Sequence, residues 1–580
     1  MKKLLLASAV SAAAIGAYVY QSGVLTQETN DLLSLIPAES AIVSVQTEAF
    51  DHYAYLKSAS FGQQQLADEF DGDLTPEQHF LIALFDGYAQ SASSPEALKK
   101  YLGTAEKINP LFYTIGLIPV YKLTLQDPAA FWHTIDQKEQ ETGATHKAEK
   151  LGSVDFRRYA VADKQEFGIG LDLIIATEGN VLTITLDSPE LGSESPLKMA
   201  LGQEKPTRSL ADTDILSALQ AKYGKENNSY AYFDHQALIK GLTTKEGNRI
   251  AKQLNVIKQP QDEEVFALLQ TPACQQELAT IGSNWPRTVA TGQFKYQEGK
   301  AVLNGDVIVE SNNKTILNAL NTIRGFLPSL KADDASIFSL GFGLEMAKLA
   351  PAVGEIWQDL RTPTYSCELL SEFQNGLGTQ NPAAMMSMAS GMVNGLKGVS
   401  FSLYDLKANF EGEYGPTLDK LDFILSMSAS DPKMLVQSAQ MFIPELAGID
   451  IPANDQPVDL TELLQDQTGL ENPLFARLND KHFTLYSGEK ATSASGEIMP
   501  QALNANGLMK FFMDSPRLLE LIDLGMQMSG EELPQEVVDA FYSESATTVT
   551  LDVNQHGLVF GFGYHNDLNE MKVAKEQASQ

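Results

Sequence analysis

The chain has 580 residues, of which 43% are hydrophobic and 20% are charged. This length predicts about two to four domains, because a single hydrophobic core stops growing well below it, and the composition excludes wholesale disorder. The formal net charge of -32 would repel phosphate backbones and anionic headgroups, so it excludes a protein that binds nucleic acid.

The first residues have the layout of a secretory signal. Two lysines precede an uncharged stretch at residues 4–20 that is rich in Ala, Leu and Val. A helix over that stretch would span about 25 Å, less than the roughly 30 Å hydrocarbon core of a bilayer, which favours removal. The apolar run continues past the small residues Ala14 and Gly16, so residues 1–23 are either a signal peptide or an N-terminal membrane anchor. We therefore expect an exported, periplasmic protein, held at the inner membrane if residues 4–20 are retained.

Three patterns follow in the first half of the chain. Residues 37–45 form a β-rich segment behind a proline, with helical stretches after it. A strand at residues 115–126 runs into Asp127-Pro128. This dipeptide predicts a helix start, since Asp accepts from free N–H groups of the first turn and Pro suits the first helical position. Residues 288–310 read as a β-hairpin.

The same patterns recur in the same order in the second half. The β-rich segment lies at residues 335–340, and a strand at residues 421–428 runs into Asp431-Pro432. A second hairpin covers residues 546–564. A repeated order of this kind predicts an internal duplication.

These repeats predict the domain organisation and the fold class. Strands joined by tight turns are antiparallel, and helical stretches alternate with them, for example at residues 215–223 and 508–526. We expect an α+β fold of two similar units, residues 24–325 and 326–580, with a linker near residues 325–334. Each unit would be a twisted antiparallel sheet packed with helices on one side.

Several short motifs carry a resemblance to known proteins. They are the export signal, the Leu-Ile-Pro-Ala-Glu-Ser-Ala start at residues 35–41, the strand-Asp-Pro-helix corners and the Asp-Gln-Pro-Val-Asp sequence at residues 455–459. In these the chain resembles uncharacterised exported proteins of marine gammaproteobacteria and is similar in layout to a domain of unknown function. The resemblance spans most of the chain after the signal. It implies no catalytic residue, because none is established for that group.

Cys274 and Cys367 are the only cysteines in the sequence, too few for a disulfide scaffold. In an oxidising compartment they could form one disulfide that closes a long loop. The alternative is two separately buried thiols. Both interpretations remain open from the sequence.

A predicted helix at residues 382–396 is unusually rich in methionine. It contains Met385, Met386, Met388 and Met392, and the first, third and fourth of these share one helix face. Such a face could pack in a core, form an adaptable binding groove, or hold a soft metal such as Cu(I). Core packing is the ordinary role, and Met385, Met388 and Met392 are the candidate binding residues if the face is a site.

Most catalytic and metal-binding motifs are absent from the sequence. No two of the 8 histidines lie three to five residues apart, which excludes a local zinc site. Neither a G-x-S-x-G elbow nor a P-loop occurs, and the S-x-x-K sequences at Ser195, Ser430 and Ser487 coincide with helix starts or a turn. Thr75 and Gln78 follow an acidic loop and have the spacing of a capping box rather than of a calcium site. We therefore predict no catalytic residue, metal or cofactor.

The expected function class follows from these observations. We expect a non-enzymatic binding or scaffold protein of the envelope that presents a groove or flat surface to an envelope protein or an apolar ligand. The alternative is a periplasmic hydrolase with acid and base residues dispersed among the 74 carboxylates. An open apolar face would favour binding, and two shielded carboxylates facing each other in a cleft would favour the hydrolase. Membrane contact is expected only through the N-terminal segment.

Overall fold

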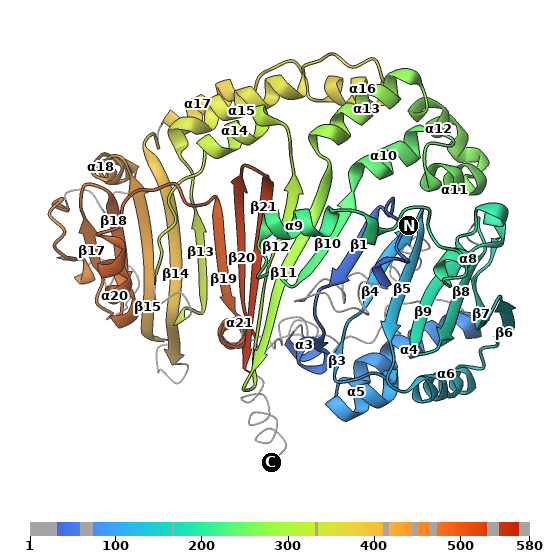
Figure 1. The fold of residues 1–580 in the computed structure, drawn as a ribbon. Helices are drawn as coiled ribbons and strands as arrows, with labels where there is room; N and C mark the ends of the chain where they lie inside the picture. The colour runs from blue at the N-terminus through green and yellow to red at the C-terminus, as the bar shows by residue number, and fades with distance from the viewer. Residues whose placement is uncertain are drawn as a thin grey trace. The chain divides into compact units, whose positions relative to one another are not determined.

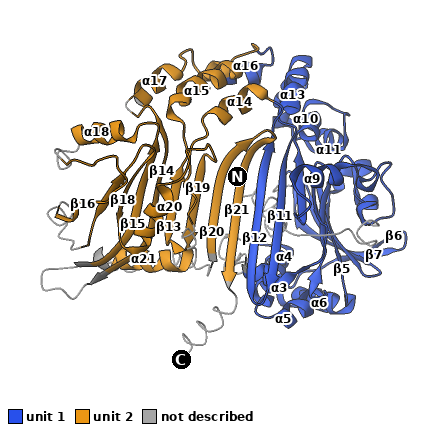
Figure 2. Ribbon diagram, turned by 60° about the vertical axis from the view of Figure 1, so that its left-hand side comes forward, with its two compact units in different colours: residues 1–312, 365–373, 567–580 blue, residues 313–364, 374–566 orange. Residues whose placement is uncertain are grey.

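The computed structural model describes residues 32–58, 74–164, 168–330, 335–391, 393–409, 417–442, 449–462, 472–529 and 545–567. The chain divides into two compact units, which Figure 2 shows in different colours. Unit 1 contains the residues up to 312 together with residues 365–373. Unit 2 contains residues 313–364 and 374–566.

Unit 2 thus begins earlier than the linker that the sequence predicts at residues 325–334. The reason is that Leu317 and Ile323 pack in a hydrophobic cluster with Leu508 and Val553 of the same unit. Burial of these side chains assigns their helix to the second core rather than to a connection.

Unit 1 is built on an antiparallel sheet (Figure 1). Its strands are β1 (Ile42–Gln46), β4 (Leu111–Ile115), β5 (Ile118–Thr124), β6 (Lys147–Leu151), β7 (Val154–Ala162), β8 (Leu171–Glu178), β9 (Val181–Asp187), β10 (Ser229–Asp234), β11 (Arg287–Gln297) and β12 (Lys300–Glu310). Hydrogen-bonded neighbours follow the order β12–β11–β10–β1–β4–β5–β9–β8–β7–β6. A separate small pair joins β2 (Phe50–Asp51) to β3 (Lys107–Ile108).

The strand that the sequence predicts over residues 115–126 is present as β5, but it begins only at Ile118. The structure has the end of β4, a tight turn and then β5 in this stretch. Gly116 occupies the turn with a φ of 65°, a left-handed conformation that glycine adopts without a Cβ clash. Both strands are buried, so apolar residues continue on either side of the turn. The sequence pattern therefore does not show where one strand ends and the next begins.

Helices of unit 1 lie on both faces of its sheet, not on one as the sequence predicts. They are α3 (His52–Ser58), α4 (Pro76–Ser91), α5 (Pro95–Leu102), α6 (Pro128–Thr142), α8 (Leu197–Ala200), α9 (Ile215–Tyr223), α10 (His235–Thr243), α11 (Arg249–Ile257), α12 (Glu263–Leu269) and α13 (Pro272–Asn284). On one face, Val43, Tyr113 and Tyr230 of the sheet form a buried cluster with Leu216 and Leu219 of α9.

The opposite face of this sheet, which carries Ser44, is covered by α3 and α4. Tyr55 of α3 lies 6.0 Å from Phe294 of β11, measured between ring centroids. Phe80 of α4 stacks on Tyr159 of β7 at 4.7 Å. Both helices belong to the chain segment between β1 and β4, so this segment closes the second face of unit 1.

Unit 2 also contains one antiparallel sheet. Its strands are β13 (Phe338–Phe342), β14 (Leu396–Asn409), β15 (Thr417–Ala429), β16 (Val458–Asp459), β17 (Phe475–Leu478), β18 (His482–Ser487), β19 (Met509–Asp514), β20 (Ser545–Asn554) and β21 (Gly557–Asp567). Its helices are α14 (Lys314–Thr322), α15 (Met346–Leu360), α16 (Glu368–Gly376), α17 (Ala383–Gly391), α18 (Pro432–Phe442), α20 (Glu489–Ile498) and α21 (Ser515–Ser529). Hydrogen-bonded neighbours follow the order β21–β20–β19–β13–β14–β15–β18–β17–β16.

The helix that the sequence predicts over residues 508–526 is wrong in its first part. Residues Met509–Asp514 form strand β19, and the helix begins only at Ser515. The run of apolar residues in this stretch fits either structure, and pairing with β13 and β20 decides for the strand.

The two units share one order of strand pairing. Along the sheets, β12, β11, β10, β1, β4, β5, β9 and β8 of unit 1 correspond in chain order and in neighbours to β21, β20, β19, β13, β14, β15, β18 and β17 of unit 2. Individual backbone hydrogen bonds also occupy equivalent positions in the two units. The N–H of Leu125 donates to Asn180 O at 2.7 Å, and the N–H of Ala429 donates to Lys481 O at 3.0 Å in the same place of unit 2.

The two strand-to-helix corners that the sequence predicts are confirmed. Asp127 Oδ1 accepts from the N–H of Ala130 at 3.1 Å, and helix α6 begins at Pro128. Asp431 Oδ1 accepts from the N–H of Met434 at 3.0 Å, and α18 begins at the following proline. In each unit this helix follows the corresponding strand of the shared pairing order, β5 in unit 1 and β15 in unit 2.

The capping box predicted from Thr75 and Gln78 is also confirmed. The Thr75 side chain accepts from the N–H of Gln78 at 3.2 Å, and the Gln78 side chain accepts from the N–H of Thr75 at 3.0 Å. These reciprocal bonds satisfy two free donors at the start of α4. The residues therefore serve a helix terminus.

Candidate binding face of unit 2

One face of the sheet in unit 2 carries apolar side chains in three cross-strand rows. Each row crosses from β18 through β15, β14, β13, β19 and β20 to β21, and each member lies directly opposite the next. The rows are Leu485, Leu425, Phe401, Leu340, Phe511, Val549 and Phe562; Phe483, Met427, Val399, Phe342, Met509, Leu551 and Phe560; and Ser487, Phe423, Leu403, Phe338, Met513, Thr547 and Tyr564. No member of these rows is charged. This surface is named the apolar face.

The apolar face is only partly buried. Phe342 is 45% exposed and Phe560 is 42% exposed, and most other members are half-buried. Aromatic rings contact one another along it: Phe338 lies 5.5 Å from Phe511, and Phe401 lies 6.2 Å from Phe423. A contiguous apolar surface of this kind is uncommon on a protein without a partner.

The opposite face of the same sheet is more deeply buried. Serine and glycine occupy much of it in β13 and β14, and Tyr404, Ile424 and Tyr486 are buried on it against α20. Ser400 and Ser426 are joined through their hydroxyl oxygens at 2.6 Å. Thr484 of β18 and Ser495 of α20 are joined in the same way at 2.8 Å. These bonds satisfy hydroxyl groups that would otherwise be buried without partners.

Close packing explains why the buried face has small residues. A Cβ at Gly398 would lie 1.9 Å from Phe326 O, and a Cβ at Gly341 would lie 3.0 Å from Leu327 Cδ2. Residues 326 and 327 thus lie directly on the strands, where only glycine or serine leaves room. Beside these two residues, the large side chains of β13 and of Val399, Phe401 and Leu403 in β14 are therefore on the other face, which is the apolar face. Tyr404, farther along β14, packs on the buried face with Ile424.

One end of the apolar face is covered by other parts of unit 2. Met427 and Phe483 pack against a hydrophobic cluster that includes Val436 of α18, Ile451 and Leu460. At the other end, Leu551 of β20 packs against the cluster of Leu317, Ile323 and Val553. The open part of the face is therefore centred on β13, β14 and β19, and Phe560 of β21 is exposed beside Leu551.

The predicted methionine face lies in α17, outside the apolar face. Met385 is 74% exposed and Met388 is 83% exposed. The interpretation of these two residues as core residues is therefore wrong, because their side chains face solvent on a helix that packs against α15 through other positions. Met392 lies outside the described residues.

The two cysteines form a disulfide between Cys274 of α13 and Cys367, with a sequence separation of 93 residues. Both are buried. The Glu277 carboxylate accepts from the N–H groups of Ser366 and Cys367 at 2.8 Å and 2.9 Å. Residues 365–373 are thus fixed to α13 by a covalent bond and by two charge-assisted hydrogen bonds.

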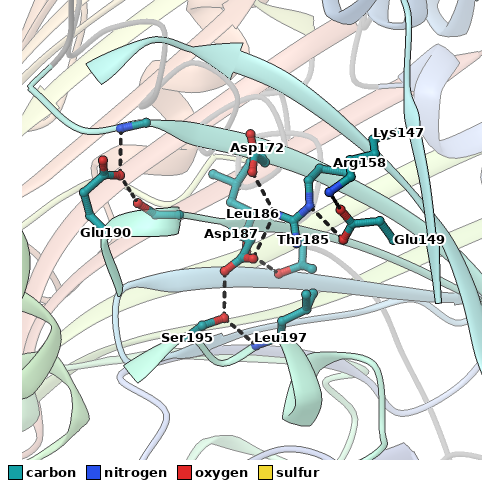
Figure 3. A network of polar contacts seen from close by, with 12 residues as sticks. Lys147, Glu149, Arg158, Asp172, Thr185, Leu186, Asp187, Glu190, Ser195 and Leu197 are labelled. Carbon is teal, nitrogen blue, oxygen red and sulfur yellow. Dashed lines mark hydrogen bonds and ion pairs between the residues drawn. The ribbon is translucent and has the colours of Figure 1, made fainter. Parts of the chain in front are cut away.

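A carboxylate cluster in unit 1 is organised by Arg158 of β7 (Figure 3). Its NH1 group donates to Asp172 Oδ2 at 2.7 Å and to Asp187 Oδ2 at 3.0 Å, and its Nε donates to Glu149 Oε2 at 3.2 Å. Burial opposes the charge of the guanidinium, but the hydrogen bonds to the two aspartates raise the pKa of Arg158. Both carboxylates are held by one guanidinium, an arrangement typical of a structural ion pair.

A second cluster in unit 1 surrounds Glu139 of α6. Its Oε1 atom accepts from Tyr159 OH at 2.5 Å and from Arg157 NH1 at 3.0 Å, and it lies 2.7 Å from His146 Nδ1. Burial, followed by the hydrogen bond to Glu139, raises the pKa of Tyr159. The carboxylate is again held by a guanidinium.

A third carboxylate, Glu310 of β12, is buried in unit 1. Arg287 Nε donates to its Oε2 atom at 2.5 Å and Lys222 Nζ donates to its Oε1 atom at 2.6 Å. Burial opposes ionisation, but the hydrogen bonds from Arg287, Lys222 and Tyr223 lower the pKa of Glu310. This group therefore stays ionised and paired.

A serine and histidine pair occurs inside unit 2. Ser428 Oγ lies 2.8 Å from His482 Nδ1, and His482 Nε2 lies 2.9 Å from Gln501 O. Burial lowers the pKa of His482. Both side chains are buried, so the pair joins β15 to β18 and offers no nucleophile to a substrate in solution.

Among the residues that the structure describes, no group of three or more His, Cys, Asp or Glu side chains could hold a metal ion. Within the same part of the chain, no helix combines the length and the apolar character needed to span a bilayer. Comparisons with protein-family models, with curated proteins and with solved structures found no match for this chain.

The apolar face is not among the features predicted from the sequence. Its signal is present in the sequence: in β13 and β14, Phe, Leu or Val occupies every second position, and Ser or Gly occupies most positions between them. That alternation predicts a strand with one apolar side, and the usual assignment places the apolar side inward. Only the packing of residues 326 and 327 shows which side is covered.

Proposed function

We propose that this protein is a non-enzymatic, exported protein of the envelope that binds apolar segments of another polypeptide through the apolar face. The observation that carries the proposal is the set of three uncharged rows with Phe342 and Phe560 more than two-fifths exposed. A sheet face with this composition favours an apolar partner.

The chemistry of the face favours a polypeptide over a small ligand. Small molecules are usually held in concave pockets, whereas the rows extend across neighbouring strands of a sheet. Met509 and Met513 lie beside phenylalanines in these rows, and flexible thioethers adapt to differing apolar side chains. The net charge of -32 favours a partner that is neutral or basic.

We also propose that the two units descend from an internal duplication. The shared order of strand pairing supports this, as do the matched corners at Asp127 and Asp431. The hydrogen bonds from Asp234 N to Ala41 O, at 2.7 Å, and from Asp514 N to Ile337 O, at 2.9 Å, occupy matching places and add to this support.

Export to the periplasm remains part of the proposal. Its support is the sequence pattern of residues 1–23, which lie outside the described residues, and the disulfide between Cys274 and Cys367, a bond typical of oxidising compartments. Retention at the inner membrane through residues 4–20 and the resemblance to exported gammaproteobacterial proteins belong to the same proposal. The hydrolase alternative lacks comparable support, since Asp172 and Asp187 both face Arg158.

The test is a binding measurement with a defined peptide. A short synthetic peptide of alternating leucine and serine, with lysine at both ends and a fluorescent label, is titrated with the protein and followed by anisotropy. Phe342→Glu/Phe560→Glu should weaken binding by at least about tenfold, because it places charges in an apolar contact. Val256→Glu/Val265→Glu is the matched control, since these residues of unit 1 are 45% and 52% exposed.

Three results would overturn the proposal. The first is that the unmodified protein does not bind the peptide. The second is that the control variant loses as much peptide affinity as Phe342→Glu/Phe560→Glu. The third is that the protein binds phosphatidylcholine vesicles and not the peptide. A variant of the peptide with glutamine in place of leucine should not bind, because it lacks the apolar side chains.

A further inference from the structure

A small pocket lies on the covered face of unit 2, which is the sheet face opposite the apolar face. Strands β13 and β14 form its floor, and Lys510 of β19 lines it beside them. Its roof is an apolar segment of the chain with Leu327, Pro328 and Leu330. The pocket has a volume of about 20 Å³, which is room for one or two water-sized groups.

The floor of this pocket differs from the matching part of unit 1. The hydrogen bonds from β10 to residue 41 and from β19 to residue 337 match β1 with β13 residue by residue, and the registers of the neighbouring strands agree. In unit 1 the five matching positions belong to one buried hydrophobic cluster and are Val43, Val45, Leu111, Tyr113 and Tyr230. In unit 2 they are, in the same order, Ser339, Gly341, Ser400, Ser402 and Lys510. The same place in the fold is thus a filled core in unit 1 and a pocket with a polar floor in unit 2.

Two serines on the floor have hydroxyl groups that the rest of the protein does not use. Ser339 and Ser402 lie directly opposite each other and are 7% and 4% exposed. Neither hydroxyl forms a hydrogen bond with another residue in the described part of the chain, whereas Ser400 is joined to Ser426. Because buried hydroxyl groups are normally paired, these two are suited to a polar group that enters the pocket.

The roof of the pocket is held in place by two side-chain amides. Asn506 accepts from the N–H of Leu327 at 2.7 Å and donates to its carbonyl oxygen at 2.8 Å. Gln501 accepts from the N–H of Ser329 at 3.1 Å and donates to its carbonyl oxygen at 2.8 Å. Pro328 between them has no N–H group to satisfy. These bonds hold the roof above the serines, so the pocket is formed before any ligand binds, as is usual for sites of small ligands.

We propose that this pocket binds a small monocarboxylate with a short apolar chain. The carboxylate accepts from the hydroxyl groups of Ser339 and Ser402, since the Cβ atoms of directly opposed residues are about 4.5–5.5 Å apart. Lys510 is the only charged residue among the described residues that line the pocket, and its positive charge favours an anion. The apolar chain lies against Leu327 and Leu330 of the roof.

The charge of the whole protein narrows the class of anion further. A net charge of -32 repels anions in proportion to their charge, so one carboxylate is favoured over phosphate or a dicarboxylate. The site goes beyond the proposed function, because it lies on the other face of the sheet and needs no polypeptide partner. A failure of the carboxylate site therefore leaves peptide binding by the apolar face untouched.

The first experiment titrates the full-length protein with sodium butyrate and follows binding by saturation-transfer NMR. Butyrate should bind in a saturable manner, and n-butanol, which has the same chain without the charge, should not bind. Ser402→Ala keeps the space but removes one donor, so affinity for butyrate should fall by at least about tenfold. Ser495→Ala is the matched control, because Ser495 is a buried serine of α20 outside the pocket.

A second pair of variants tests the charge. Lys510→Gln should weaken butyrate binding several-fold, because the cation that favours the carboxylate is lost. Lys433→Gln is its control, since Lys433 of α18 is exposed and does not line the pocket. It should bind butyrate as the unmodified protein does.

A third variant gives the pocket the residue that unit 1 has at the matching position. Ser339→Val places a methyl group in the open space and removes the hydroxyl, so butyrate binding should be lost. Near-UV circular dichroism should show an unchanged fold, and the free energy of unfolding in urea should not fall, because the change removes an unpaired hydroxyl group.

Four results would overturn the carboxylate site. The unmodified protein does not bind butyrate, or n-butanol binds as tightly as butyrate does. Ser402→Ala and Lys510→Gln bind butyrate no more weakly than their controls. Ser339→Val keeps its affinity for butyrate, which would show that the anion binds elsewhere.

Discussion

Gly398 of β14 lies against the backbone of Phe326, so closely that a Cβ at this position would be 1.9 Å from Phe326 O. This contact determines which face of the sheet in unit 2 is covered. Where the segment that contains Phe326 packs, the covered face carries glycine and serine, and the large side chains of Phe338, Leu340 and Phe342 lie on the other face.

Gly398→Ala is therefore expected to destabilise unit 2 by about 1–3 kcal/mol or more, because the backbone of residue 326 must move. The matched control is Gly525→Ala in α21, where a Cβ would meet nothing within 4 Å and where alanine should stabilise the helix by about 0.5–1 kcal/mol. Urea unfolding measures both changes. Equal stability of the two variants would contradict the packing described for this face.

Removal of the disulfide should destabilise the protein. Constraint of a loop with a sequence separation of 93 residues corresponds to about 4–5 kcal/mol in the chain-entropy treatment. The free energy of unfolding of Cys274→Ala/Cys367→Ala should fall by up to this amount in denaturant titrations. Two cysteines that can be alkylated in folded, unreduced protein would show that the bond does not form.

Acid should destabilise unit 1 partly through His52. Burial lowers the pKa of His52 to about 3, whereas the unfolded residue titrates near 6.5. Between these values the unfolded chain binds a proton that the folded chain does not, so stability decreases as pH falls, by about 3 kcal/mol between pH 6.5 and pH 4. The His52→Gln variant should lose this part of the pH dependence in thermal melts. An unchanged pH dependence would contradict the buried, neutral state of His52.

The two corner aspartates should have similar energetic roles. Asp127→Ala and Asp431→Ala each remove the side-chain acceptor from the first turn of α6 or α18. We predict a loss of about 0.5–2 kcal/mol for each. Replacement by asparagine, which also accepts at this position, should restore most of the stability. A large loss in one unit with none in the other would argue against equivalent corners.

Local rules predicted much of the fold. Hairpins at β11–β12 and β20–β21, the corners at Asp127 and Asp431 and the capping box at Thr75 follow from turn and cap chemistry, which acts within a few residues. Errors arose where an apolar run fitted two structures, as at β19, because long-range pairing decided the outcome.

The candidate site could not be predicted in the same way. The alternating residues of β13 indicate two different faces, but they do not say which one is covered. Coverage depends on where residues 326 and 327 lie and on the place of α15 to α17, and both are tertiary properties. Likewise, two cysteines with a sequence separation of 93 do not reveal whether they meet.

The most direct test of the proposed binding face is a fluorescence reporter within it. Phe342→Trp places an indole in the open part of the face, opposite Val399 and Met509, and the three native tryptophans are replaced by phenylalanine. Addition of the leucine–serine peptide should shift the emission to shorter wavelength in a saturable manner, as water leaves the indole. Emission that does not change at peptide concentrations that saturate binding would show that the partner binds elsewhere and would contradict the account.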